Sequence, residues 1–163
     1  MNRTPIEIMM AMPNFKALYD PLDWFSCNPL QEYIDGHTWV NRREITVRIP
    51  GRLLEAPMDP VVITVGAPFL HDFASIPWWA RWYLPMTGQE GQPWGVPALC
   101  HDWLYEEQRI GDWFISRRTA DQIFRVLMEY VRIPEKKTNI MYGAVRIGGG
   151  PCWRRHFRAR TEG

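Results

Sequence analysis

The sequence contains few cysteines, and their spacing excludes two classes of small protein. Cys27, Cys100 and Cys152 are an odd number, lie far apart and form no C-x-x-C pair. A disulfide framework needs an even set of cysteines, and a structural zinc site needs ligands at short spacings. We therefore expect free thiols, which are typical of a reducing compartment.

Long apolar runs and an excess of charge of one sign are also missing. No stretch approaches the roughly 20 consecutive apolar residues that a membrane helix requires. The apolar run near the N-terminus is interrupted by Glu7 and closed by Pro13, so it does not resemble a secretory signal. Lys and Arg number 19 and Asp and Glu 18, a balance that does not indicate nucleic-acid binding by bulk charge. We expect the chain to stay in the cytoplasm in which it is made, unless a larger particle carries it out.

The overall composition is that of one globular domain. The chain has 163 residues, of which 46% are hydrophobic and 23% charged, values close to the globular average. We predict a single domain over residues 1–163, with an extended N-terminal arm (1–36) and a basic C-terminal tail (151–163). Nine Trp and fourteen Pro exceed the usual share. The tryptophans fit either a small core or an interface with another protein or a lipid headgroup.

The hydrophobic pattern predicts strands first and helices second. Residues 45–49 alternate between apolar and polar side chains, and residues 61–65 are rich in β-branched side chains, so we expect a small antiparallel sheet. The later spacing predicts several helices: a short one over 74–83, one from about Pro97, one capped by Ser116 or Thr119, and a third from Pro134 to the glycines at 148–150. This order predicts the α+β fold class.

Two of these helices carry the side chains that are able to do chemistry. His101 and Tyr105 are four residues apart and share a helix face, with Asp102 adjacent, and Asp121 lies in the first turn of the next helix. If the two helices pack antiparallel, Asp121 approaches the His101 ring, fixes its tautomer and frees the other nitrogen to act as a general base toward water. Asp102 points in a slightly different direction, in which its carboxylate is able to hold a hard cation such as calcium. A purely structural His-Asp pair fits the same spacing.

Three motifs of the chain resemble a family of unknown function that is encoded by tailed phages and prophages. They are VVITVGAPFLHDFASIPWWARW, PALCHDWLY and ADQIF, which match the patterns D-F/G-A-S-I-P, A-x-x-H-D-x-L-Y and A-D-x-x-F over about residues 45–130. The resemblance implies a phage or prophage origin and brings no activity with it. His71 stands where many members have Thr, and we expect it at the surface. Asp72 is either a helix cap or a further metal ligand near His101.

The helix pair is also similar to the active-site helices of phospholipase A2, in the style of the capsid-borne enzymes of parvoviruses. That resemblance rests on A-x-x-H-D-x-x-Y followed by A-D-Q-x-F. It implies that His101 activates water, that Asp102 binds calcium, that Asp121 orients the His101 ring, and that Tyr105 donates a hydrogen bond to Asp121. The family's calcium loop, Y-x-G-x-G, is replaced here by YLPMTGQEG at residues 83–91.

The C-terminal tail interleaves basic and aromatic side chains. This pattern is able to bind the phosphates of lipid headgroups or of nucleic acid, and equally to dock on a neighbouring subunit. With a net charge near zero elsewhere, nucleic acid is not indicated. The basic residues are Arg154, Arg155, Arg158 and Arg160.

Three functions of different class follow from these residues and resemblances. The first is a virion component of the phage tail or baseplate, made in the bacterial host cytoplasm and built around the phospholipase-like helix pair, with other virion proteins as its partners. The alternative is an active metal-dependent hydrolase of lipid or envelope esters that uses His101 as its general base, and a host-directed effector is a third reading.

Overall fold

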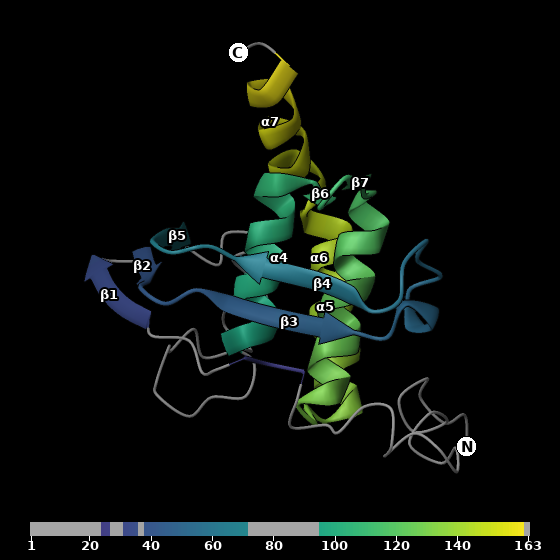
Figure 1. Cartoon of the computed structure of the whole chain (residues 1–163). Coiled ribbons are helices and arrows are strands. Elements are labelled where there is room, and N and C mark those ends of the chain that lie inside the picture. The colour runs from purple at the N-terminus through teal and green to yellow at the C-terminus, as the bar shows by residue number, and fades with distance from the viewer. Residues whose placement is uncertain (1–23, 27–30, 36–37, 72–94, 162–163) are drawn as a thin grey trace.

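The computed structural model describes residues 24–26, 31–35, 38–71 and 95–161. The longer strands occupy the N-terminal half of this part, and the C-terminal half is helical apart from one short hairpin, so the predicted α+β class is confirmed. In Figure 1 a strand pair lies across one side of a helix pair, another helix lies behind that pair, and the last helix projects away from the body. Within the described ranges, no helix combines the length and the apolar character that crossing a bilayer demands.

The predicted strands at 45–49 and 61–65 are present with those bounds. β3 (Ile45–Ile49) and β4 (Val61–Val65) pair antiparallel, with Val47 opposite Ile63. Their odd-numbered side chains are buried, as the period of a half-buried strand requires. A one-turn 3-10 helix, η2 (Gly51–Leu53), lies in the connection between them.

A second small sheet contains part of the predicted N-terminal arm. It has the order β1-β2-β5, formed by β1 (Gln31–Asp35), β2 (Thr38–Asn41) and β5 (Phe69–His71). The Trp24 side chain is buried and stacks on Tyr130 at 4.1 Å between ring centroids. The described residues of the arm are therefore held by the sheets and by a helix.

The predicted helix pair is formed by α4 (Gly95–Glu107) and α5 (Arg117–Tyr130). A hairpin of β6 (Arg109–Ile110) and β7 (Trp113–Phe114) joins them. Gly111 takes a φ of +57° at its turn, a conformation that favours glycine. Of the two predicted caps, Ser116 is the one used, because its side chain accepts a hydrogen bond from the Thr119 backbone N–H.

Two more helices complete the described chain. α6 (Glu135–Gly148) begins after Pro134 and ends at the glycine run, as predicted. The predicted basic tail is instead a helix, α7 (Gly150–Thr161), which projects at the top of Figure 1. Its first turns pack on α4 through Trp153, whose ring meets Tyr105 edge-on at 5.2 Å. This packing gives the segment a tertiary contact that a solvated tail lacks.

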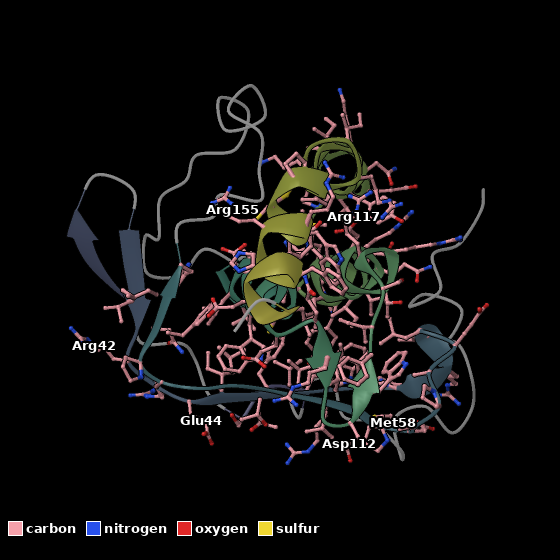
Figure 2. All side chains as sticks on the ribbon, turned by 90° about the horizontal axis from the view of Figure 1, so that it is seen from above. Arg42, Glu44, Met58, Asp112, Arg117 and Arg155 are labelled. Carbon is pink, nitrogen blue, oxygen red and sulfur yellow. The ribbon has the colours of Figure 1, made fainter. Side chains whose placement is uncertain are left out.

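The core lies between the β3–β4 pair and the helices. Seen from above in Figure 2, charged side chains such as Arg42, Glu44 and Asp112 point outward at the rim of the molecule. The predicted helix at 74–83 and the loop at 83–91 lie outside the described residues.

Candidate functional site

The centre of the site is a buried hydrogen bond between α4 and α5. His101 Nε2 lies 2.9 Å from Asp121 Oδ1, and both side chains are almost fully buried. On the same helices the His101 ring contacts Phe124, whereas Tyr105, one turn later on α4, contacts Asp121. The two helices therefore run antiparallel, which is the arrangement that brings the predicted pair together.

Asp121 is held as an anion by three hydrogen-bond donors, His101, Tyr105 and Arg146, and by the nearby charge of Arg117. Its Oδ1 also accepts a hydrogen bond from the Tyr105 hydroxyl at 2.7 Å. Its Oδ2 lies 2.7 Å from Arg146 Nη1 of α6 and 3.5 Å from Arg117 Nη1. Burial acts to raise the pKa of Asp121, but the hydrogen bonds from His101, Tyr105 and Arg146 outweigh it and hold that pKa below its usual value. The carboxylate therefore stays charged although it is out of contact with water.

The environment of His101 favours its neutral form. Burial lowers the pKa of His101 below its usual value, and Arg117 acts in the same direction, which together exceed the opposite effect of Asp121. With Asp121 as the acceptor, the proton of the neutral ring sits on Nε2, and Nδ1 keeps its lone pair. The Tyr105 and Phe124 rings lie 4.2 and 4.7 Å from the imidazole centroid and fix its plane.

Tyr105 is itself positioned by the C-terminal helices. The Trp153 ring packs against it, and the Gln108 side chain donates a hydrogen bond to the Trp153 carbonyl at 2.8 Å. Gly149, at the joint between α6 and α7, lies so close that a Cβ there would collide with the Tyr105 hydroxyl. Burial and the neighbouring Asp121 charge raise the pKa of Tyr105, so its hydroxyl keeps the proton that it donates.

Asp102 lies beside the His101 ring at the more open side of the site. Its side chain is 12% exposed, and its Oδ1 lies 4.0 Å from His101 Nδ1. The other oxygen, Oδ2, lies 4.0 Å from Nδ1 of His71 on β5. Both distances are too long for a direct hydrogen bond. They place a carboxylate between two imidazole nitrogens.

The surface position expected for His71 is wrong. The residue is 5% exposed, because β5 alternates buried, exposed and buried side chains and His71 falls on the inner face with Phe69. The pairing of β5 with β2 fixes this face. This burial was readable from the sequence, since His71 stands two residues after the apolar Phe69, which is the period of a strand.

The remaining predicted site residues do not join this centre. Asp72 lies outside the described residues. Arg154 and Arg155 are exposed on α7, and Figure 2 labels Arg155 there; Arg158 and Arg160 belong to the same helix. Within the described ranges, no group of three or more His, Cys, Asp or Glu side chains is arranged to hold a metal ion.

One comparison with known proteins assigns a family. Residues 53–145, more than half of the chain, match the family described as protein of unknown function (DUF1353). The chain belongs to this family. The matched range of this DUF1353 protein includes His101, Asp102, Tyr105 and Asp121, and it ends at Val145, before Arg146. No curated protein and no solved structure matches the chain.

Two arginines of the site were not predicted from the sequence. Arg117 is one turn before Asp121 on α5, so its i, i+4 spacing was a readable signal. Arg146 comes from the end of α6, 25 residues after Asp121. Nothing in the sequence indicates that this helix returns to the α4–α5 pair.

Proposed function

We propose that this DUF1353 protein is a hydrolase of lipid or envelope esters in which His101 is the general base. One observation carries the proposal, namely the 2.9 Å hydrogen bond that joins His101 Nε2 to the charged Asp121 carboxylate. A base of this kind needs a neutral ring, a fixed tautomer and an acid that stabilises the charge it acquires. The buried α4–α5 pair supplies all three.

The proton path begins at His101 Nδ1. Because Nε2 donates to Asp121, the Nδ1 lone pair faces the Asp102 side, where Oδ1 lies 4.0 Å away. A single water molecule spans such a gap by donating to both atoms. When that water attacks an ester carbonyl, its proton passes to Nδ1, the ring becomes an imidazolium, and the carbonyl oxygen becomes the oxyanion of a tetrahedral intermediate. As the intermediate collapses, the ester C–O bond breaks and the imidazolium returns the proton to the leaving alcohol oxygen, which restores the neutral ring. The Asp121 charge stabilises the imidazolium, and Tyr105 acts as a positioning residue because its hydroxyl donates a hydrogen bond to that carboxylate.

Calcium remains the proposed cofactor at Asp102, but the metal-ligating side chains that the structure describes there are too few and of the wrong kind to hold calcium by themselves. Calcium takes six to eight oxygen ligands. The described part of the site offers one carboxylate, Asp102, placed between two imidazoles, and imidazole nitrogen suits zinc or other transition metals better. The general-base step is therefore derived without a metal, and dependence on calcium is measured as a separate question.

The class of substrate is supported by α7. This helix exposes Arg154, Arg155 and Phe157, the last with 57% of its surface accessible. Basic side chains beside an exposed aromatic ring are typical of helices that contact anionic lipid headgroups. The phospholipase A2 resemblance of the helix pair favours the same substrates. The resemblance to a family encoded by phages and prophages favours a host envelope as the target.

Hydrolysis is tested with vesicles of anionic phospholipid carrying a fluorogenic ester, with calcium and with a chelator. The expected result is turnover that falls at least about a hundredfold in His101→Ala, since a general base contributes that much or more. Glu44→Gln is the control, because Glu44 is an exposed residue that belongs neither to α7 nor to the His101–Asp121 pair. Equal rates in the two variants would overturn the assignment of His101.

The second candidate function is a structural subunit of the virion tail or baseplate, as the phage resemblance implies. The observation that favours it is the projection of α7 beyond the body of the domain, with Phe157 exposed. A neighbouring virion protein is able to cover this helix. The measurement is mass spectrometry of purified phage particles that encode the chain. Particles that assemble and infect normally without it exclude the structural role.

A further inference from the structure

Among the residues that the structure describes, β4 pairs with no strand other than β3, and the neighbours of β3 show which backbone groups of β4 point to its other edge. The Ser26 backbone N–H donates to the Thr46 carbonyl at 2.9 Å, and the Arg48 N–H donates to the Trp24 carbonyl at 2.8 Å. Thr46 and Arg48 thus direct their backbone groups toward the 24–26 segment. In an antiparallel pair alternate residues bond to opposite sides, so Val47 and its odd-numbered neighbours bond to β4.

The pairing register between β3 and β4 shows which backbone groups of β4 point toward β3 and which point away from it. Val47 lies opposite Ile63, and Arg48 lies opposite Val62. Ile63 therefore bonds to β3, while Val62 and Thr64 direct their N–H and C=O groups to the opposite edge. Within the part of the chain that the structure describes, no backbone hydrogen bond reaches Val62 or Thr64 from that side.

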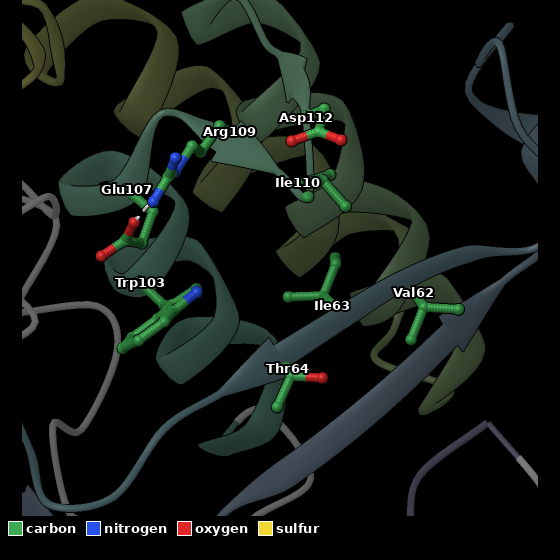
Figure 3. A pocket seen from close by; sticks show the side chains of 9 residues that line it. Val62, Ile63, Thr64, Trp103, Glu107, Arg109, Ile110 and Asp112 are labelled. Carbon is green, nitrogen blue, oxygen red and sulfur yellow. Dashed lines mark ion pairs between the residues drawn. The ribbon is translucent and has the colours of Figure 1, made fainter.

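A cleft runs along this same edge. Its volume is about 500 Å³, and Figure 3 shows it between β4, the C-terminal turns of α4 and the β6–β7 hairpin. The Trp103 ring lies on the α4 side, and the Val62 side chain is 40% exposed on the β4 side. Backbone donors and acceptors thus lie next to apolar side chains, the two features that an added strand uses for affinity and specificity.

The charged side chains that line the cleft indicate which kind of segment binds there. Glu107 and Asp112 contribute two carboxylates, and Arg109 contributes one guanidinium, which lies 3.6 Å from Glu107. The cleft is therefore negative overall. A second copy of this chain would bring the same carboxylates toward one another, which disfavours self-pairing.

We propose that the β4 edge binds an extended segment of another protein as an added β-strand, with a Lys or Arg side chain of that segment beside Asp112 and Glu107. The site lies on the opposite edge of the β3–β4 pair from residues 24–26 and is independent of the hydrolase proposal. Val62 and Thr64 donate and accept the backbone hydrogen bonds, and Trp103 packs against an apolar side chain of the added strand.

The test uses a fluorescein-labelled heptapeptide that alternates Lys with Val, titrated against the full chain by fluorescence anisotropy. Val62→Pro removes the N–H that points into the cleft and spares the bonds of Ile63 to β3, and proline is tolerated on edge strands. Loss of one such hydrogen bond weakens binding about five- to tenfold. Val62→Ala keeps the N–H and shortens the apolar side chain that lines the cleft, so the pair separates the two contributions: Val62→Ala weakens binding less than Val62→Pro does.

Two further measurements keep the outcome independent of how Val62→Pro folds. A peptide N-methylated on alternate residues binds the unaltered protein at least about fivefold more weakly, because it loses the same bonds from the ligand side. Asp112→Asn weakens binding of the Lys peptide, whereas Glu44→Gln, which changes a carboxylate away from the cleft, does not. Binding that N-methylation and Asp112→Asn both leave unchanged, or equal binding of a Glu-Val peptide, would overturn the proposal.

Discussion

Replacing Asp121 by Asn tests the buried network that unites three helices. The substitution keeps the shape and removes the charge. Oδ1 keeps its hydrogen bonds from His101 and Tyr105, but each changes from a charge-assisted to a neutral bond and loses about 1 kcal/mol. The new amide nitrogen faces Arg146 Nη1, which lies 2.7 Å from Asp121 Oδ2. Arg146 is 32% exposed, so we allow about 1 kcal/mol for that partner.

The sum is about 3 kcal/mol of the free energy of unfolding, within the range for removing one partner of a buried ion pair. In a domain of this size the melting temperature falls by about 2–4 °C per kcal/mol, so a decrease of about 6–12 °C is expected. Urea denaturation followed by circular dichroism measures the free energy, and a thermal scan measures the shift.

Asp112→Asn is the control, since it makes the same chemical change at an exposed position. Its effect stays within about 0.5 kcal/mol. A loss below about 1 kcal/mol in Asp121→Asn would refute the reasoning, because it would mean that the buried charge contributes no more than an exposed one.

Three other predictions concern the same helices. Burial lowers the pKa of His101 in the folded protein, so the unfolded chain binds more protons below pH about 6.5, the ordinary pKa of histidine, and the free energy of unfolding falls as the pH drops below that value. His101→Gln makes the free energy of unfolding depend less on pH in this range, which urea titrations at several pH values measure. Gly149→Ala destabilises the fold through its collision with Tyr105, whereas Gly143→Ala, with open space around its Cβ, stabilises α6 by about 0.5–1 kcal/mol in the same assay. Ser116→Ala removes the cap of α5 and lowers the free energy of unfolding by about 1 kcal/mol, measured by thermal denaturation; an unchanged value would contradict the capping role.

The sequence alone predicted the strands and helices whose pattern is local. In β3 and β4 buried and exposed side chains alternate with a period of two, and α5 carries an apolar stripe with the helical period. These patterns predict which face of each element is buried. The turn at Gly111 and the helix start after Pro134 were equally predictable from the sequence, because glycine permits a positive φ and proline restricts φ.

The position of the predicted His-Asp pair was also readable, since it needs only two neighbouring helices in antiparallel packing. The same reasoning failed for the last segment of the chain. Residues 150–161 have no long apolar stripe, and their helix packs on the body through a few contacts such as that of Trp153 with Tyr105. A pattern of basic residues predicts exposure and says little about helix or coil.

The residues themselves determined the α+β order, the caps and the spacing that puts His101, Tyr105 and Asp121 on facing helices. Only the tertiary structure brought Arg146 from α6 onto Asp121 and His71 from β5 onto Asp102. The reason is physical: local preferences act over a turn of helix or a pair of strand residues, whereas the protonation of a buried carboxylate or imidazole depends on every charge within a few ångströms, whatever its distance along the chain.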